Sequence, residues 1–346
     1  MRNTKDSLQR IAKVLRGHLF VVPRLLANKH MQMLLSFITP YYHGNIAKQE
    51  RRYIKLSDGS QLVADCFFQQ KKEAHPTIVV INGFEGYVGS GASRFSEGIS
   101  YKAYHFGFNV IHLKQRGEGD AIHLTHSLFA ADPVPDMEAA FVQFINWGLH
   151  RFFLIGLSGG GWAALFAAAK LPARIQSKIA GIVSISPPIN HLDTLAHAAQ
   201  HPLYSWLLLQ VYKNLVRRRA KIDPPGTWDM KQLRAIKTVR QWGETYLRRI
   251  VSDLSEQVSA VDEYHRKTDL TPLLPKGTIP TLIIHAKDDP ITPHGSFTTL
   301  SNPFILTLFP NDGAHGAFIS AKKLYGDIDR HWAQNRAMEF ISLLEQ

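Results

Sequence analysis

The stretch FFLIGLSGGGWAALFAAAK, residues 152–170, decides the fold of this chain. Residues 152–155 form a short apolar run, which is typical of a buried β-strand. An alanine-rich helical pattern follows, and between the two lies Gly156-Leu157-Ser158-Gly159-Gly160, which fits G-x-S-x-G. The glycines remove side chains that would clash with the neighbouring strand and helix. The stretch therefore predicts a serine in a strained turn between a strand and a helix, the alternative being an ordinary glycine-rich turn without chemistry.

Strand and helix patterns alternate on both sides of this stretch. The strand patterns cover residues 51–56, 61–68, 77–81, 109–113, 152–155, 179–185, 281–285 and 305–309. The helical patterns between them cover residues 93–105, 136–148 and 160–169. Strands separated by helices predict an α/β protein with a mainly parallel, twisted sheet that is covered by helices on both faces.

The stretch from residue 187 to residue 275 interrupts this alternation. It contains no convincing strand pattern but several helical ones, including residues 204–219 and 230–249. An insertion between two core strands lies over the carboxyl ends of the strands, where α/β sheets bind ligands. We therefore expect an N-terminal helical extension (1–50), a core (51–186 and 276–346) and an inserted helical cap (187–275).

Composition excludes several classes of protein. The chain has 346 residues, of which 45% are hydrophobic, so it can bury a sizeable core. Its one cysteine, Cys66, excludes an intrachain disulfide and a cysteine-based zinc site. Neither a secretory signal pattern nor a run of about 20 apolar residues is present. We expect a cytoplasmic protein, with peripheral contact to a membrane as a further option.

A serine hydroxyl becomes a nucleophile only when a base takes its proton. In hydrolases built on the strand–turn–helix unit, the acid and the histidine follow the serine in that order. Asp289 follows the strand pattern at residues 281–285 and stands directly before Pro290, so we choose it as the acid, with Asp288 as the fallback and a helix-capping acid as the alternative. His315 follows the last strand pattern between small residues and is the expected base.

The intermediate of acyl transfer also needs donors for its oxyanion. The expected donors are the backbone N–H groups of Gly159, after the serine, and Phe84, in the loop that follows residues 77–81. These five residues predict attack of Ser158 on an acyl carbon, with His315 as base and Asp289 as its orienting acid. No metal and no organic cofactor is implied.

Beyond these residues, the chain resembles the YheT-like branch of the α/β-hydrolases. The matching segments, in family order, are LLANKHMQ at 25–32, INGFEG at 81–86, QRGEG at 115–119 and ISPP at 185–188. The resemblance covers roughly residues 22–345 and implies the α/β-hydrolase fold and an esterase or lipase that acts on acyl esters, in some members phospholipids. Asn82 stands where histidine is usual, and Gly159 where a bulkier residue often follows the serine. Both departures bear on substrate preference.

Two other functions compete with the esterase. The same catalytic residues could hydrolyse a thioester or an amide, and a catalytically idle member of this fold could act as a binding protein at a membrane.

The formal net charge of +12 favours anionic partners. Residues 213–249 contain eleven basic and three acidic residues, a net charge of +8, which suits anionic lipid or simply a solvated face. Residues 7–22 have an amphipathic helical pattern, which suits a docked helix better than a membrane-surface helix. Nucleic acid is not an expected partner because no binding motif accompanies the charge.

Overall fold

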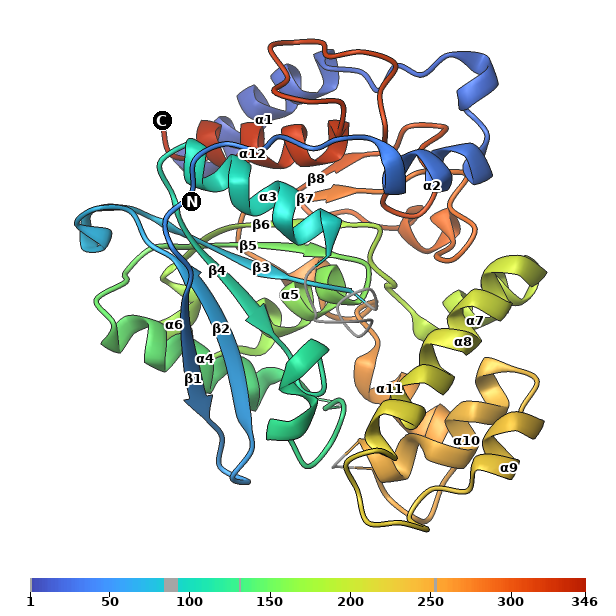
Figure 1. The fold of residues 1–346 in the computed structure, drawn as a ribbon. Coiled ribbons are helices and arrows are strands. Elements are labelled where there is room, and N and C mark those ends of the chain that lie inside the picture. The colour runs from blue at the N-terminus through green and yellow to red at the C-terminus, as the bar shows by residue number, and fades with distance from the viewer. Residues whose placement is uncertain (1, 84–92, 131, 252–253) are drawn as a thin grey trace.

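A computed structural model describes residues 2–83, 93–130, 132–251 and 254–346. Its centre is an eight-stranded sheet in the order β1-β2-β4-β3-β5-β6-β7-β8 (Figure 1). The antiparallel hairpin β1–β2 pairs antiparallel to β4, and all further pairs from β4 to β8 are parallel. The strands are β1 (Glu50–Lys55), β2 (Gln61–Phe67), β3 (Thr77–Ile81), β4 (Asn109–Lys114), β5 (Phe152–Leu157), β6 (Ile179–Ile185), β7 (Thr281–Ile284) and β8 (Ile305–Leu308).

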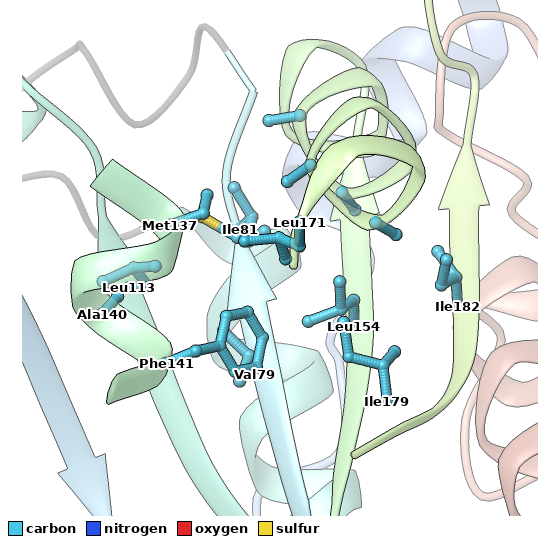
Figure 2. Packing of buried hydrophobic residues seen from close by; sticks show 14 of the residues in the cluster. Val79, Ile81, Leu113, Met137, Ala140, Phe141, Leu154, Leu171, Ile179 and Ile182 are labelled. Atoms are coloured by element: carbon cyan, nitrogen blue, oxygen red, sulfur yellow. The ribbon is translucent and has the colours of Figure 1, made fainter. Parts of the chain in front are cut away.

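Helices cover both faces of this sheet, which confirms the predicted fold class. One face carries α4 (Val134–Asn146), α5 (Gly159–Lys170) and α6 (Ala173–Gln176), and the other carries α1 (Arg2–Gly17), α3 (Arg94–His105) and α12 (Trp332–Leu344). Figure 2 shows how apolar side chains of α4 and α5 meet those of the sheet, with Phe141 over Val79. The inner strands β3, β5 and β7 are buried along their whole length and are almost entirely apolar, whereas the edge strand β1 is mostly exposed and charged.

The N-terminal helix α1 covers Arg2–Gly17, so it begins and ends about five residues earlier than the predicted residues 7–22. Its apolar stripe, Leu8, Ile11 and Leu15, is buried in the cluster that also contains α12. This is the docked arrangement, in which the stripe faces the core.

Helices also fill the chain between β6 and β7. They are α7 (His191–Ala199), α8 (Pro202–Arg219), α9 (Met230–Ala235), α10 (Val239–Ile250) and α11 (Ala260–Thr268). These helices share a hydrophobic cluster built around Trp242 and Tyr246. The predicted helix over 230–249 is two helices, because the extended backbone at Thr238 starts α10 with a capping box.

The remaining described elements are the helix α2 (Lys29–Ile38) and the short 3₁₀-helices η1 (Arg24–Leu26), η2 (Lys72–Ala74), η4 (Gly119–Leu124), η5 (Leu274–Lys276) and η6 (His294–Phe297). Within the described ranges, no helix has the length and apolar character needed to span a bilayer.

The packing of β5 on α5 generates a first prediction. A Cβ atom at Gly160 would lie 2.1 Å from the carbonyl oxygen of Ile81, whereas one at Gly17 meets nothing within 4 Å. Gly160→Ala should lower the free energy of unfolding by about 3 kcal/mol or more, because backbone cannot move aside as a side chain can. The matched control Gly17→Ala should change it by less than about 1 kcal/mol. Urea denaturation followed by circular dichroism measures both, and equal midpoints would show that the turn tolerates the methyl group.

Candidate active site

Ser158 joins β5 to α5 in a backbone conformation that few side chains adopt. Its φ and ψ angles are 54° and −122°, while its N–H donates to the Ile185 carbonyl oxygen at 2.8 Å. A Cβ at Gly156 would lie 2.3 Å from the Gly160 carbonyl carbon, so the turn closes only because both positions are glycine. The serine hydroxyl thus stands at the carboxyl end of the central strands and at the start of α5.

Asp289 lies in the loop after β7 and is fully enclosed. Its carboxylate accepts hydrogen bonds from the N–H groups of Ile291 and Thr292, at 2.8 and 3.0 Å, and from the Thr292 hydroxyl at 2.8 Å. Burial by itself raises the pKa of this carboxyl, but His315 and these donors outweigh burial and hold the pKa below its usual range. The group is therefore a buried carboxylate whose acceptor sites are occupied.

His315 connects the serine and the aspartate. Its Nε2 lies 2.9 Å from Ser158 Oγ, and its Nδ1 lies 2.8 Å from Asp289 Oδ2. Asp288, the fallback acid, accepts the Ala314 N–H at 2.9 Å instead. Burial raises the pKa of Asp288 to about 6, aided by the charges of Asp312 and Asp289. The structure thus brings together Ser158, Asp289 and His315, whereas the Asp288 side chain binds the backbone of the loop that carries His315.

Two further residues, for which the sequence pattern predicts no such role, hold the histidine loop. Ser186, at the carboxyl end of β6, accepts the Gly316 N–H with its Oγ at 3.1 Å. Gln32 is fully buried and forms a pair of hydrogen bonds with the backbone of Ile319, at 2.8 Å to its N–H and 3.3 Å to its carbonyl oxygen. Both residues stand in segments that carry the family resemblance, which was the available signal.

The N-terminal segment with that resemblance also reaches the inserted helices. Asn28 caps α2 by accepting the His30 N–H at 2.8 Å. The His30 ring stacks on Tyr204 of α8, with Nδ1 2.9 Å from the tyrosine hydroxyl. On α7, His197 Nε2 lies 2.8 Å from the carbonyl oxygen of Asp289. The start of α2, the helices α7 and α8, and the acid loop are therefore tied to one another.

The loop after β3 begins beside the nucleophile. A Cβ atom at Gly83 would lie 2.9 Å from Ser158 Cβ, so this glycine allows the loop to pass close to the serine. The N–H of Gly159 lies at the first position of α5, where helix N-termini favour negative charge. Phe84, the other expected oxyanion donor, lies outside the described residues.

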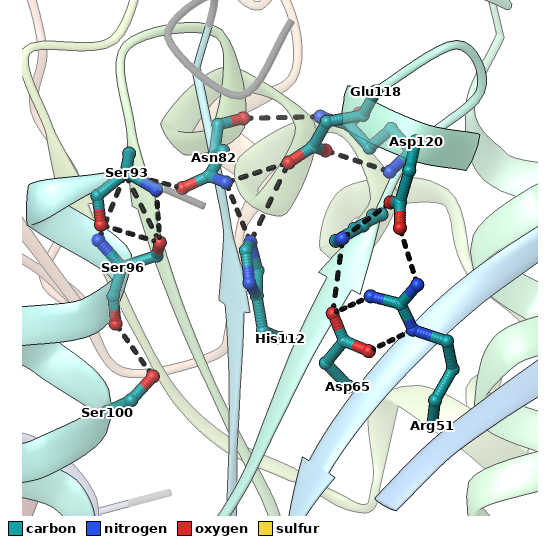
Figure 3. Close-up of polar contacts among 11 residues, drawn as sticks. Arg51, Asp65, Asn82, Ser93, Ser96, Ser100, His112, Glu118 and Asp120 are labelled. Atoms are coloured by element: carbon teal, nitrogen blue, oxygen red, sulfur yellow. Dashed lines mark hydrogen bonds and ion pairs between the residues drawn. The ribbon is translucent and has the colours of Figure 1, made fainter. Parts of the chain in front are cut away.

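The side chain of Asn82 fixes the start of the loop after β3. Its side chain is fully buried and donates to Glu118 Oε1 at 2.7 Å, while Nδ2 also lies 2.7 Å from His112 Nε2 (Figure 3). Ser93, at the start of α3, donates to Asn82 Oδ1 at 3.0 Å. The asparagine therefore connects β3, β4 and α3, and its role here is to fix the loop that leads to Gly83.

A cavity of about 140 Å³ opens from Ser158 and Gly159 between the sheet and the inserted helices. Most of its walls are apolar or aromatic, and they come from α7, α8, α10 and α11: Leu195, Leu208, Tyr212, Trp242, Leu247 and Val261. Two histidines also line it. Burial lowers the pKa of His191 to about 3 and that of His265 to about 4, so both rings are neutral at pH 7. The cavity suits an uncharged, largely apolar group next to the serine.

The basic stretch 213–249 is partly turned inward. Lys213 Nζ donates to the carbonyl oxygens of Arg234 and Ile236, at 3.2 and 2.7 Å. Arg219 donates to the carbonyl oxygen of Thr125 at 2.6 Å, and Arg218 donates to that of Gly119. These cations bind backbone carbonyl groups. In the described part of the chain, no three His, Cys, Asp or Glu side chains are grouped so as to hold a metal ion.

Comparison with known proteins gives the family of this chain. A model described as "Alpha/beta hydrolase family" matches residues 78–326. The chain is 24% identical to "Putative esterase YheT" of Escherichia coli (strain K12) over an alignment of 342 positions, which covers 93% of each protein. It is 24% identical to "Putative esterase slr0264" of Synechocystis sp. (strain ATCC 27184 / PCC 6803 / Kazusa) over 211 residues, 58% of this chain and 54% of that protein. The expected resemblance to the YheT-like branch is thus confirmed.

A solved structure supports the fold. The Pyrococcus furiosus esterase Pf2001 superimposes with a TM-score of 0.54 at 14% identity, covering 89% of this chain and 97% of that one. At this identity the likeness bears on the fold alone.

The hydrogen bonds of the two neighbouring acids generate a second prediction. Asp289→Asn should slow the reaction of Ser158 with a fluorophosphonate by about 10³–10⁴-fold, because the amide cannot hold the imidazole in the tautomer that accepts the serine proton. Asp288→Asn should slow it by less than about tenfold, because an amide oxygen can still accept the Ala314 N–H. Stopped time courses of labelling, resolved by gel fluorescence, measure both rates. The opposite ranking would identify Asp288 as the acid.

Proposed function

The chain belongs to the alpha/beta hydrolase family, and we propose that it is a serine hydrolase that cleaves carboxylic esters through Ser158, His315 and Asp289. The observation that carries the proposal is the unbroken series of contacts from Ser158 Oγ to His315 Nε2, at 2.9 Å, and from His315 Nδ1 to Asp289, at 2.8 Å. A nucleophile, a base and an orienting acid in this order are the parts that acyl transfer needs.

In the first half of the reaction, Ser158 Oγ attacks the ester carbonyl carbon while His315 Nε2 takes the hydroxyl proton. Asp289 stabilises the imidazolium that forms, because its carboxylate is already ionised and bound to Nδ1. The carbonyl oxygen becomes an oxyanion, for which the Gly159 N–H at the start of α5 is the proposed donor, with Phe84 N–H as the second. The intermediate collapses, His315 gives its proton to the departing alcohol, and the acyl group remains on Ser158.

In the second half, water takes the place of the alcohol. His315 removes a proton from the water as it attacks the acyl carbon, and then returns a proton to Ser158 Oγ. The products are a carboxylic acid and the free enzyme.

The inserted helices over residues 187–275 are proposed to act as a cap that selects the substrate. Their apolar side chains form one wall of the cavity, and the core forms the other. An acyl chain loses contact with water when it enters such a cavity, at roughly 25 cal/mol per Å² of apolar surface. We therefore propose an uncharged acyl ester as the substrate, including esters of lipids.

The third prediction tests the nucleophile. Ser158→Ala should lower kcat for a p-nitrophenyl acyl ester by about 10⁴-fold or more, because no other group on this turn can carry the acyl chain. Release of p-nitrophenolate measures turnover, and circular dichroism shows whether the variant is folded. Ser177→Ala, which removes an exposed hydroxyl bonded to the Arg174 carbonyl oxygen at the end of α6, is the control and should retain the activity of the parent chain. Near-normal turnover by folded Ser158→Ala would refute the assignment.

Thioester and amide analogues of the same acyl chain complete this test. Esters should be turned over faster than amides, because an amide nitrogen stabilises the carbonyl group more strongly and, unlike an alkoxide, leaves only after it has been protonated. A preference for the thioester or the amide would leave the assignment of the catalytic residues unchanged and would replace the ester as the proposed substrate class.

A further inference from the structure

Large hydrophobic side chains are exposed mainly in one region of the described chain. Sixteen such side chains are exposed, and nine of these come from η1, α2, α7 and α8. The most exposed members are Leu25 at 89%, Phe37 at 65%, Ile38 at 64% and Trp206 at 56%. Exposed apolar side chains are ordinary when they are scattered, but a cluster of this size indicates a binding surface.

The clustered side chains form regular stripes on two helices. Met31, Leu34 and Ile38 recur at helical spacing on the exposed side of α2, with Phe37 beside them. Leu203, Trp206 and Leu207 do the same on the first two turns of α8. We call these seven residues and Leu25 of η1 the apolar rim.

The two helices of the apolar rim are held together where they begin. His30 of α2 stacks on Tyr204 of α8, and Lys29 Nζ lies 3.5 Å from His201 Nδ1. Both helices lie beyond the carboxyl ends of the parallel strands, on the side of the molecule where the strand arrows point (Figure 1).

The chain segments that carry the apolar rim have a one-sided charge. Residues 7–49 contain six Lys or Arg and no Asp or Glu. Residues 194–222 contain five Lys or Arg and no Asp or Glu, although three of these cations, Lys213, Arg218 and Arg219, bind backbone carbonyl oxygens. The whole chain has 28 acidic residues in 346, so two acid-free stretches of this length stand out. The nearest acid before the second stretch, Asp193, is exposed on α7. Exposed apolar helix faces in chain segments that contain cations and lack acids are typical of peripheral attachment to anionic lipid.

One helix connects this surface to the cavity. On α8, Leu208 and Tyr212 line the cavity, while Leu203, Trp206 and Leu207 are exposed on the opposite side. A helix with apolar residues on both sides needs two apolar neighbours, and the described protein supplies only the inner one.

We propose that the apolar rim docks on an anionic lipid layer and so places the mouth of the cavity at the lipid surface. Delivery of lipid esters to Ser158 rests on the proposed function, whereas docking itself does not. The contact lies on α2 and the start of α8, and it does not use Arg218 or Arg219, which are bonded to backbone carbonyl oxygens.

The fourth prediction concerns vesicle binding by the apolar rim, which vesicle sedimentation measures. The full chain should bind vesicles of phosphatidylcholine with roughly one-third phosphatidylglycerol more strongly than vesicles of phosphatidylcholine alone, and less strongly as salt rises. The double variant Phe37→Ser, Trp206→Ser should bind at least about tenfold more weakly, because two aromatic side chains no longer enter the interface. A second pair, Leu34→Ser with Leu203→Ser, should behave in the same way.

Matched controls come from exposed aromatic residues elsewhere. Phe106 and Tyr53 are 50% and 54% exposed, close to the values of Phe37 and Trp206, and lie on α3's C-cap and on β1. The double variant Phe106→Ser, Tyr53→Ser should bind vesicles as the parent chain does. Equal loss in test and control variants, or no vesicle binding by the parent chain, would overturn the proposal.

Two further readouts separate the competing explanations. Hydrolysis of a short, soluble ester should be the same in the parent chain and in all variants; its absence in the parent chain would count against the proposed function and leave the docking result to stand by itself. Analytical ultracentrifugation without lipid tests a second copy of the chain as the occupant. A dimer that Phe37→Ser, Trp206→Ser dissociates would assign the rim to self-association and overturn the lipid proposal.

Discussion

The rest of the site depends on the backbone of Ser158, whose φ of 54° turns the chain from β5 into α5 within one residue. This conformation costs of order 1–3 kcal/mol and persists only where the surroundings enforce it. Here the enforcement is close contact: Gly156 and Gly160 bring α5 against β5 and β3, and the Ser158 N–H is fixed by β6. The serine hydroxyl can therefore face the cavity without freedom to turn away.

The parallel sheet then determines where the other two groups must be. Asp289 follows β7, which pairs in parallel with β6, and His315 follows β8, which pairs in parallel with β7, so their loops emerge at the same edge as Ser158. The loop that carries His315 spans the distance from β8 back to Ser158. Ser186, after β6, and Gln32, on α2, bind the backbone of this loop. An imidazole between a serine and a carboxylate needs placement to a fraction of an ångström, and these backbone contacts supply it.

The sequence was sufficient for the features that depend on local pattern. All eight strand patterns correspond to strands, and the glycines around Ser158 predicted the turn because their small size is the physical requirement. The break before α10 had a local signal, because Thr238 and Gln241 fit a capping box. The anchor at Gln32 and the network around Asn82 could not be predicted in the same way. Each depends on partners that are distant in the chain, such as Ile319 for Gln32, and a residue's type does not reveal its partner. Asp289 and His315 could be chosen from the sequence because strand ends, which are local features, fix both positions.

Because a residue's type does not reveal its partner, the total charge of a segment does not predict which ligand that segment binds. Residues 213–249 carry much of the chain's positive excess, yet Lys213 and Arg219 bind carbonyl oxygens inside the structure and attach the inserted helices to one another and to the core. A buried cation used in this way cannot also attract an external anion at full strength, because its field is already satisfied by nearby carbonyl dipoles. What remains informative is where acidic residues are missing beside exposed apolar helix faces. Without acidic residues, these segments do not repel anionic lipid headgroups, and lipid contact removes their apolar side chains from water. These two properties favour lipid binding by α2 and the start of α8, which the number of arginines alone does not.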